Sequence, residues 1–215
     1  MHAATLLLAD GRFPAGGHAH SGGLEAAVAD GSVRDMDTLR LFLRGRLRTT
    51  GLVTAALAAA ACDGDPSRWA MLDAEADART PSPAQRETSR RQGRALLRAA
   101  RLAWPDALWH ALGHAPHHPI VLGVAAAAAG CTPPEAARIA AYQSVTGPAS
   151  AAVRLLALDP LRVSALLAVL AAEIDDIASR VGEAALAGEL PYPGAPALDL
   201  LAETHARAEA RLFAS

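Results

Sequence analysis

One stretch near the C-terminal end constrains the fold more than any other, because its apolar side chains recur with the period of an α-helix. From Leu161 to about Leu186, apolar residues follow one another at spacings of an α-helix: Leu166, Leu167, Leu170, Ile174, Ile177 and Val181. This spacing places them along one face of a long helix, and that face is expected to belong to the core.

The composition extends the helical prediction to the whole chain. Apolar residues make up 52% of the 215 residues, yet aromatic residues make up only 4%, so that Ala and Leu carry most of the hydrophobicity. Both are strong helix formers, whereas the residues that favour strands are scarce. We therefore expect an all-α fold. A chain of this length is expected to form a single domain, residues 1–215, built as a bundle of about eight to ten helices.

Capping residues and prolines divide the chain into helical segments. Asp35 and Thr132 are good N-caps, and Ser82 with Gln85 has the spacing of a capping box. Gly147-Pro148 predicts a break between two helices. Helices are expected to start near Ser21 and at Thr132. Further helices are expected over about residues 35–61, 67–78, 83–103, 117–129, 149–158, 161–186 and 197 to the end.

Charge and motif content exclude several classes of protein. The net charge is −2, which argues against a broad nucleic-acid surface. All basic residues are Arg, and without a Lys the chain cannot be a P-loop nucleotidase. No nucleophile motif, dinucleotide fingerprint or EF-hand is present, so we expect an interaction protein that is not an enzyme and uses no cofactor.

The cellular location is expected to be the cytoplasm. The longest apolar run, Ile120 to Cys131, is too short to span a bilayer, and the N-terminal end does not resemble a secretory signal. The cysteines, Cys62 and Cys131, match no metal-binding spacing and are interpreted as buried free thiols in a reducing compartment.

A row of arginines in the first quarter of the chain leaves two interpretations open. Arg40, Arg44 and Arg48 fall four apart on one helix face, which indicates either a solvated stripe or contact with an acidic partner. Glu173 is expected to be a solvated carboxylate.

Gly93 lies inside a predicted helix, where glycine is unfavourable, so a close packing contact is expected there.

A histidine cluster also allows two interpretations. His110 and His114 are four apart, the spacing of metal ligands on one helix face, and His117 and His118 follow closely. Gly and Pro residues interrupt a helix here, however, and no carboxylate or Cys completes a ligand set. We favour histidines at turns and helix ends, and keep a metal-binding hydrolase as the alternative.

The stretch from Leu6 to Val28 is the most unusual part of the sequence, because Gly and His are concentrated between two apolar segments. Its Gly pairs predict positive φ or the close approach of another chain. Phe13 is expected either to tuck into the core below a turn or to form part of a binding surface.

Five segments, in order, resemble the UreF family of urease accessory proteins over nearly the whole chain. They read LADGRFPAGGHAHSGGLEAAV, RETSRRQGRALL, HHPIVLGVAAAAAG, AAYQSVTGPASAAVRL and LDLLAETHARAEARLFAS. After Arg154-Leu155 many members carry a Gly-Gln segment that is absent here, so no role of that Gln is carried over.

The resemblance implies a set of partner-binding residues: Phe13, Pro14, Gly16, Gly17, His20, Ser21, Leu24, Glu25, Gln92, Gly93, Tyr142, Arg154, His205, Arg211, Leu212 and Phe213. It also implies a homodimeric, chaperone-like scaffold that joins the accessory protein UreD (also called UreH), recruits the GTPase UreG and serves nickel insertion into apo-urease. Such a scaffold would modulate GTP hydrolysis without performing it.

Overall fold

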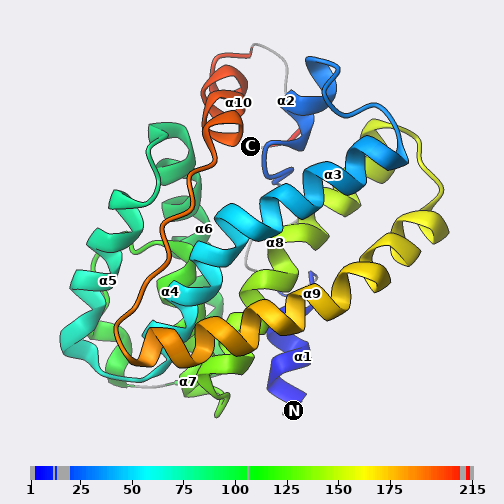
Figure 1. The fold of residues 1–215 in the computed structure, drawn as a ribbon. Coiled ribbons are helices and arrows are strands. Elements are labelled where there is room, and N and C mark those ends of the chain that lie inside the picture. The colour runs from blue at the N-terminus through cyan, green and yellow to red at the C-terminus, as the bar shows by residue number, and fades with distance from the viewer. Residues whose placement is uncertain (1–2, 12, 14–19, 106, 209–211, 214–215) are drawn as a thin grey trace.

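The computed structural model describes residues 3–11, 13, 20–105, 107–208 and 212–213, and none of these lies in a β-strand. The all-α prediction is therefore confirmed (Figure 1). In chain order the α-helices are α1 (Ala3–Ala9), α2 (Leu24–Ala29), α3 (Met36–Arg46), α4 (Leu52–Cys62), α5 (Pro66–Ala78), α6 (Pro83–Ala103), α7 (His118–Ala128), α8 (Pro133–Leu155), α9 (Pro160–Leu186) and α10 (Pro196–Ala206).

Helix α4 lies at the centre of the bundle and packs against α7, α8 and α9. Its residues from Ala55 to Cys62 are all buried, and most of them are Ala, which lets neighbouring helices approach closely. A single turn of π-helix, Leu47–Gly51, joins α3 to α4, so the expected helix over 35–61 is confirmed apart from this local widening.

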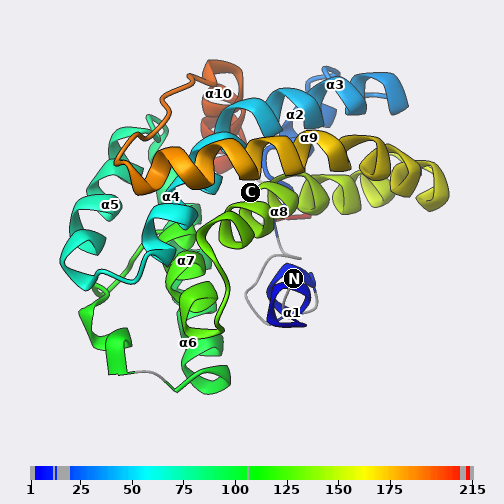
Figure 2. The ribbon, with the colours of Figure 1, turned by 60° about the horizontal axis from the view of Figure 1, so that its bottom comes forward.

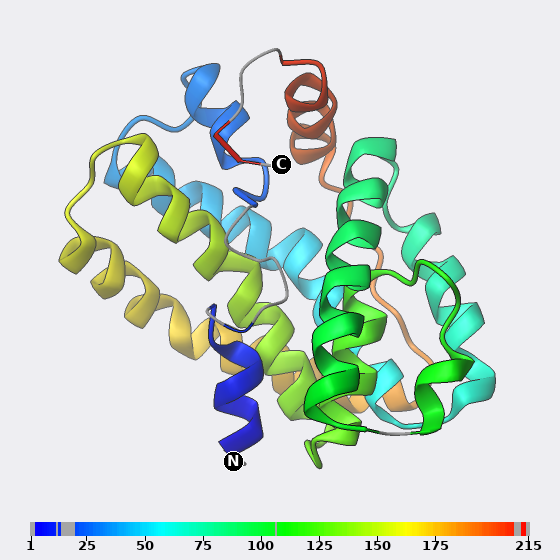
Figure 3. The ribbon, with the colours of Figure 1, turned by 180° about the vertical axis from the view of Figure 1, so that it is seen from behind.

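The other helices surround this centre. Helices α8 and α9 run side by side and α3 lies along them, whereas α5, α6 and α7 form the opposite side of the bundle (Figure 2). Seen from behind, α1 rests against α8, and α10 stands between α2 and α6 (Figure 3). Among the described residues, no helix is both long and apolar enough to cross a membrane.

Most helix starts follow the predicted caps. Asp35 forms a reciprocal capping box with Thr38, and Thr132 forms one with Glu135. At α6 the Ser82 side chain accepts the Gln85 N–H at 3.2 Å, which is one half of the predicted capping box, but the Gln85 side chain does not bond back to the Ser82 N–H. The carboxylate that completes this cap comes from α10, because Glu203 Oε1 accepts from the Ser82 hydroxyl at 2.5 Å and from the Ala84 N–H at 2.9 Å. The cysteines are free and buried, as expected.

The predicted break at Gly147-Pro148 is wrong, because α8 continues through Pro148. A proline inside a helix leaves the carbonyl four residues earlier without its N–H donor. That carbonyl belongs to Ser144, and the Arg46 side chain of α3 supplies the missing donor, with Nε 2.9 Å from the Ser144 oxygen. Since Arg46 Nη1 also donates to the Gly22 carbonyl at 2.8 Å, one guanidinium joins α3, α8 and the segment before α2.

The prediction that the last helix runs to the end of the chain is also wrong. Helix α10 ends at Ala206, and the described residues Leu212 and Phe213 lie in a bend. Their backbone N–H groups donate to the Glu25 carboxylate, which replaces helical carbonyls as the acceptor.

Replacing Arg46 by Met is expected to lower the free energy of unfolding by about 2–3 kcal/mol, because two carbonyls lose a charged donor. In a Pro148→Ala background the same replacement is expected to cost about 1 kcal/mol less, since an alanine at this position can donate its own N–H to the Ser144 carbonyl. Urea unfolding of the four proteins in this double-mutant cycle measures the difference. Equal costs in both backgrounds would contradict the assigned role of Arg46, and the exposed Arg40→Met is the control.

Candidate partner-binding groove

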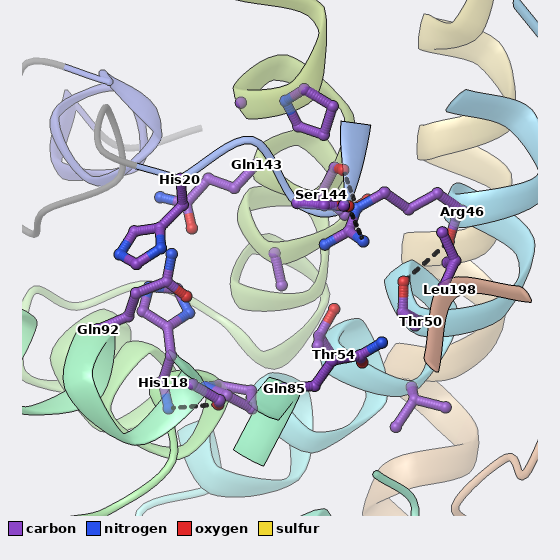
Figure 4. A pocket seen from close by; sticks show the side chains of 18 of the residues that line it. His20, Arg46, Thr50, Thr54, Gln85, Gln92, His118, Gln143, Ser144 and Leu198 are labelled. Atoms are coloured by element: carbon purple, nitrogen blue, oxygen red, sulfur yellow. Dashed lines mark hydrogen bonds between the residues drawn. The ribbon is translucent and has the colours of Figure 1, made fainter. Parts of the chain in front are cut away.

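A cavity of about 740 Å³ opens where α6, α8, α10 and the segment before α2 meet. We call it the central groove (Figure 4). Among the residues that line it are Phe13, His20, Arg46, Gln92, His118, Tyr142, Gln143, Arg154, Leu198, His205 and Phe213.

The groove brings together many of the residues that the family resemblance marked as partner-binding. Those that line it are Phe13, His20, Gln92, Tyr142, Arg154, His205 and Phe213. They come from both ends of the chain and from its middle, so the fold gathers segments that are far apart in the sequence. Pro14, Gly16, Gly17 and Arg211 lie outside the described residues.

Other marked residues support the groove from within the core. Ser21 and Leu24 are fully buried, and the Ser21 hydroxyl accepts the Glu25 N–H at 3.2 Å, which starts α2. A Cβ atom on Gly93 would lie 2.0 Å from the Pro116 carbonyl oxygen. The predicted close contact at Gly93 is therefore confirmed, and α6 could not pass the segment before α7 with any larger residue.

Glycine is also required next to Arg46. Gly22 has φ +62° and Gly23 has φ +89°, so the positive φ predicted for this Gly pair is confirmed. A Cβ atom on Gly22 would lie 3.0 Å from both Arg46 Cζ and Pro148 Cγ. The glycine thus leaves room for the guanidinium that supports α8, and burial lowers the pKa of Arg46 to about 10.

At one end of the groove, Glu25 anchors the last part of the chain. Its carboxylate accepts the N–H groups of Leu212 at 2.7 Å and Phe213 at 3.0 Å. His205 Nε2 lies 3.3 Å from the Phe213 carbonyl oxygen and 3.7 Å from the Glu25 carboxylate, and Arg154 stacks over the Phe213 ring at 5.0 Å. Phe213 is thereby buried, whereas 80% of Leu212 remains exposed.

Phe13 lies beside another aromatic ring at the groove. Its ring centroid is 5.9 Å from that of Trp104, the residue that ends α6. Phe13 is half-buried and also lines the cavity, so it packs against the core and borders the groove at the same time.

At another part of the groove, two histidines lie close enough to affect each other. Burial and, to a smaller extent, the nearby Arg91 together lower the pKa of His20 to about 4. Burial likewise lowers the pKa of His118 to about 4, with His20 as the second cause. Both imidazoles are consequently neutral at pH 7.

The alternative histidine cluster does not form a common site. His110 and His114 are exposed, whereas His117 is buried in a hydrogen-bond network. His117 Nδ1 lies 2.9 Å from Ser89 Oγ, and Nε2 lies 2.8 Å from Asp77 Oδ1. Both ring nitrogens are therefore engaged.

The same network contains the one group of His, Cys, Asp or Glu side chains, among the described residues, with metal-like spacing. Asp73, Asp77 and His117 place ligand atoms within 4.8 Å of one another. Arg90 already supplies the cation here, because its guanidinium donates to Asp73 at 3.0 Å and to Asp77 at 2.6 Å. Ser89 Oγ also accepts the His118 N–H at 3.3 Å, which connects the network to the first residue of α7. The network is a structural clamp between α5, α6 and the start of α7.

Sequence reasoning missed several residues that build the groove. Arg46 was not singled out, because an Arg that donates to the carbonyl freed by a helix proline has no sequence signature until the packing is known. Gln143 was missed for the same reason, since its partner Leu8 is far away in the sequence. Asp77 of the neighbouring clamp was also missed, because its partner His117 is distant in the sequence.

Replacing Glu25 by Ala is expected to release the last part of the chain, because the N–H groups of Leu212 and Phe213 lose a charged acceptor. Hydrogen–deuterium exchange at these amides should accelerate at least about tenfold. Asp30→Ala, at the exposed end of the same helix, should leave the exchange unchanged. Unchanged exchange in Glu25→Ala would contradict the anchoring role.

Comparison with known proteins identifies relatives along the whole chain. A family model described as UreF matches residues 33–171. Proteins named "Urease accessory protein UreF" are 50% identical in Mycobacterium sp. (strain JLS), over 98% of this chain and 97% of theirs, and 48% identical in Mycolicibacterium vanbaalenii, over 99% and 98%. The relative from Mycobacterium tuberculosis (strain ATCC 25177 / H37Ra) is 45% identical over 99% of this chain and 98% of its own. The chain belongs to the UreF family of urease accessory proteins.

Proposed function

We propose that this chain is a non-catalytic scaffold of urease maturation. It binds UreD (UreH), recruits the GTPase UreG, and modulates GTP hydrolysis during nickel insertion into apo-urease. Membership of the UreF family supports a role in urease maturation. The absence of any Lys supports a scheme in which UreG, and not this chain, hydrolyses GTP. A P-loop GTPase needs a Lys on the nucleotide phosphates, and this chain cannot supply it.

The observation that carries the proposal is the composition of the central groove. Its lining combines apolar groups, such as Phe13 and Leu198, with hydrogen-bonding groups, such as Gln92 and Tyr142. Protein interfaces combine an apolar centre with polar groups in this way, and Tyr and Arg are enriched in them. Tyr142 and Arg154 are exposed at this groove and are therefore accessible to a partner.

The anchored end of the chain forms one border of the proposed interface. Phe213 is fixed by Glu25, His205 and Arg154, and this holds the neighbouring Leu212 side chain exposed to solvent. An exposed leucine on a fixed backbone loses little conformational entropy on binding, which favours it as a contact residue. The proposal also includes a homodimer, a cytoplasmic location and one all-helical domain spanning residues 1–215.

Deleting residues 212–215, or replacing Leu212 by Asp, is expected to weaken binding to UreD at least about tenfold, because an apolar contact and its anchor are lost. Co-purification of the full chain with tagged UreD, followed by a binding titration, measures this. Leu102→Asp is the matched control, because Leu102 is about as exposed as Leu212 but belongs to α6 and not to the anchored end of the chain. Equal UreD binding by the Leu212 and Leu102 variants would refute the anchored end of the chain as part of the UreD surface.

A further inference from the structure

Helix α6 has a strong excess of positive charge. It contains six arginines and one carboxylate, Glu87, although the whole chain has a net charge of −2. The helix packs against α7 and α10 and lies at the edge of the bundle (Figure 2). Its remaining side faces solvent, so any arginine on that side is available to a partner.

The six arginines fall into two groups. Arg86 and Arg90 are used within the fold, because Arg86 donates to backbone carbonyls before α6 and Arg90 binds two carboxylates of α5. The other four follow one another at spacings of three and four residues, which places them on one side of the helix. We call them the arginine stripe: Arg91, Arg94, Arg98 and Arg101. Three of them are exposed, and Arg94 is partly exposed.

The positive charge at the C-terminal end of the stripe is not neutralised within the described residues. Arg94 has a carboxylate partner, since its Nη2 lies 3.2 Å from Glu87 Oε1. Arg101 donates to the carbonyl of Trp109 at 3.3 Å, a contact that leaves its charge in place. In the part of the chain that the structure describes, neither Arg98 nor Arg101 forms an ion pair with a carboxylate. These like charges, one helical turn apart, repel each other.

Leu102 adds an apolar group to the same surface. It is 86% exposed, more than any other large apolar side chain among the described residues, and it lies one turn after Arg98. The helix dipole favours an arginine near the C-terminal end of a helix, but it gives no reason for an exposed leucine beside it. Arginines around an apolar group are typical of a protein interface.

The spacing of the stripe indicates the chemistry of its partner. Ten residues separate the first arginine from the last, about 15 Å along the helix, so that successive charges lie about 5 Å apart. Carboxylates on one side of a helix recur at about 5.4 Å, whereas those on one side of a strand recur at about 6.6–6.8 Å. Guanidinium groups bind carboxylates through paired N–H groups. A nucleic-acid backbone would offer no apolar group to Leu102, and a membrane requires a broader apolar face than one leucine.

We propose that the arginine stripe and Leu102 bind an acidic amphipathic helix of a partner protein. The contact between Arg94 and Glu87 is of the type expected for each arginine, and Glu87 competes with the partner for Arg94. This surface is distinct from the anchored end of the chain, which is the proposed UreD contact. The proposal therefore concerns a partner other than UreD.

A fluorescence-anisotropy titration of the full chain with a synthetic peptide tests the surface. The peptide is an alanine-based helix with four Glu at spacings of three and four residues and one Leu on the same side. The control peptide has Gln in place of each Glu. We expect the Glu peptide to bind about tenfold more tightly than the Gln peptide, and this difference should shrink as NaCl is raised.

Variants of the chain locate the binding surface. Arg98→Gln with Arg101→Gln is expected to weaken binding of the Glu peptide about fivefold, because two ion pairs are lost. Glu87→Gln should strengthen it about twofold, since Arg94 loses its internal partner. Arg40→Gln, at an exposed arginine of α3, is the matched control and should leave binding unchanged.

A comparison with UreD separates this proposal from the scaffold function. Leu102→Asp should weaken binding of the Glu peptide and leave UreD binding unchanged, whereas Leu212→Asp should do the reverse. Failure of the peptide to bind would thus leave the scaffold proposal standing.

Several outcomes would overturn the acidic-helix site. Equal affinity for the Glu and Gln peptides would do so, and this comparison uses the unaltered chain, so it does not depend on the folding of a variant. Equal binding by the Arg98/Arg101 variant and the unaltered chain would also contradict the site. Binding of a DNA duplex or of phosphatidylserine vesicles through these arginines, without binding of the Glu peptide, would assign the stripe to another class of partner.

Discussion

The guanidinium of Arg46 is the contact on which the arrangement of this helical bundle depends. It supplies a donor to the carbonyl that Pro148 leaves unpaired, and it holds the Gly22 carbonyl at the same time. Burying a cation costs free energy unless hydrogen bonds offset the lost hydration. Two carbonyls offset it here, and the result is a long α8 with the N-terminal segment fixed across its middle, where the central groove forms.

Local chemistry explains which parts of the fold were predictable. The caps at Asp35 and Thr132 use partners three residues away, and the apolar period of α9 lies within one helix, so the sequence contains the information. The continuity of α8 was not predictable, because a residue from another helix compensates for its proline. Glu173 was expected to be solvated, yet it pairs with Arg44 and Arg48 of the stripe on α3 and the following π-turn. Such pairs depend on packing between helices that only the tertiary structure reveals.

The residues of the candidate site were likewise predictable only in part. The family resemblance found residues at the groove, such as Tyr142 and Arg154, together with core residues that shape it, such as Leu24 and Gly93. It could not distinguish these roles, because a motif records residue types and contains no information on burial. The groove's histidine pair combines His20 from the N-terminal motif with His118 from the middle of the chain. Gln143, which also lines the groove, was not singled out, because no local pattern sets this residue apart.

On the scaffold function proposed above, this member of the UreF family acts by assembly with UreD. The most direct measurement is the mass, by light scattering, of the complex purified after co-expression of the two full chains. The account predicts a stable complex that contains two copies of each protein. A chain that purifies alone, with no mass beyond its own oligomer in the presence of UreD, would contradict it.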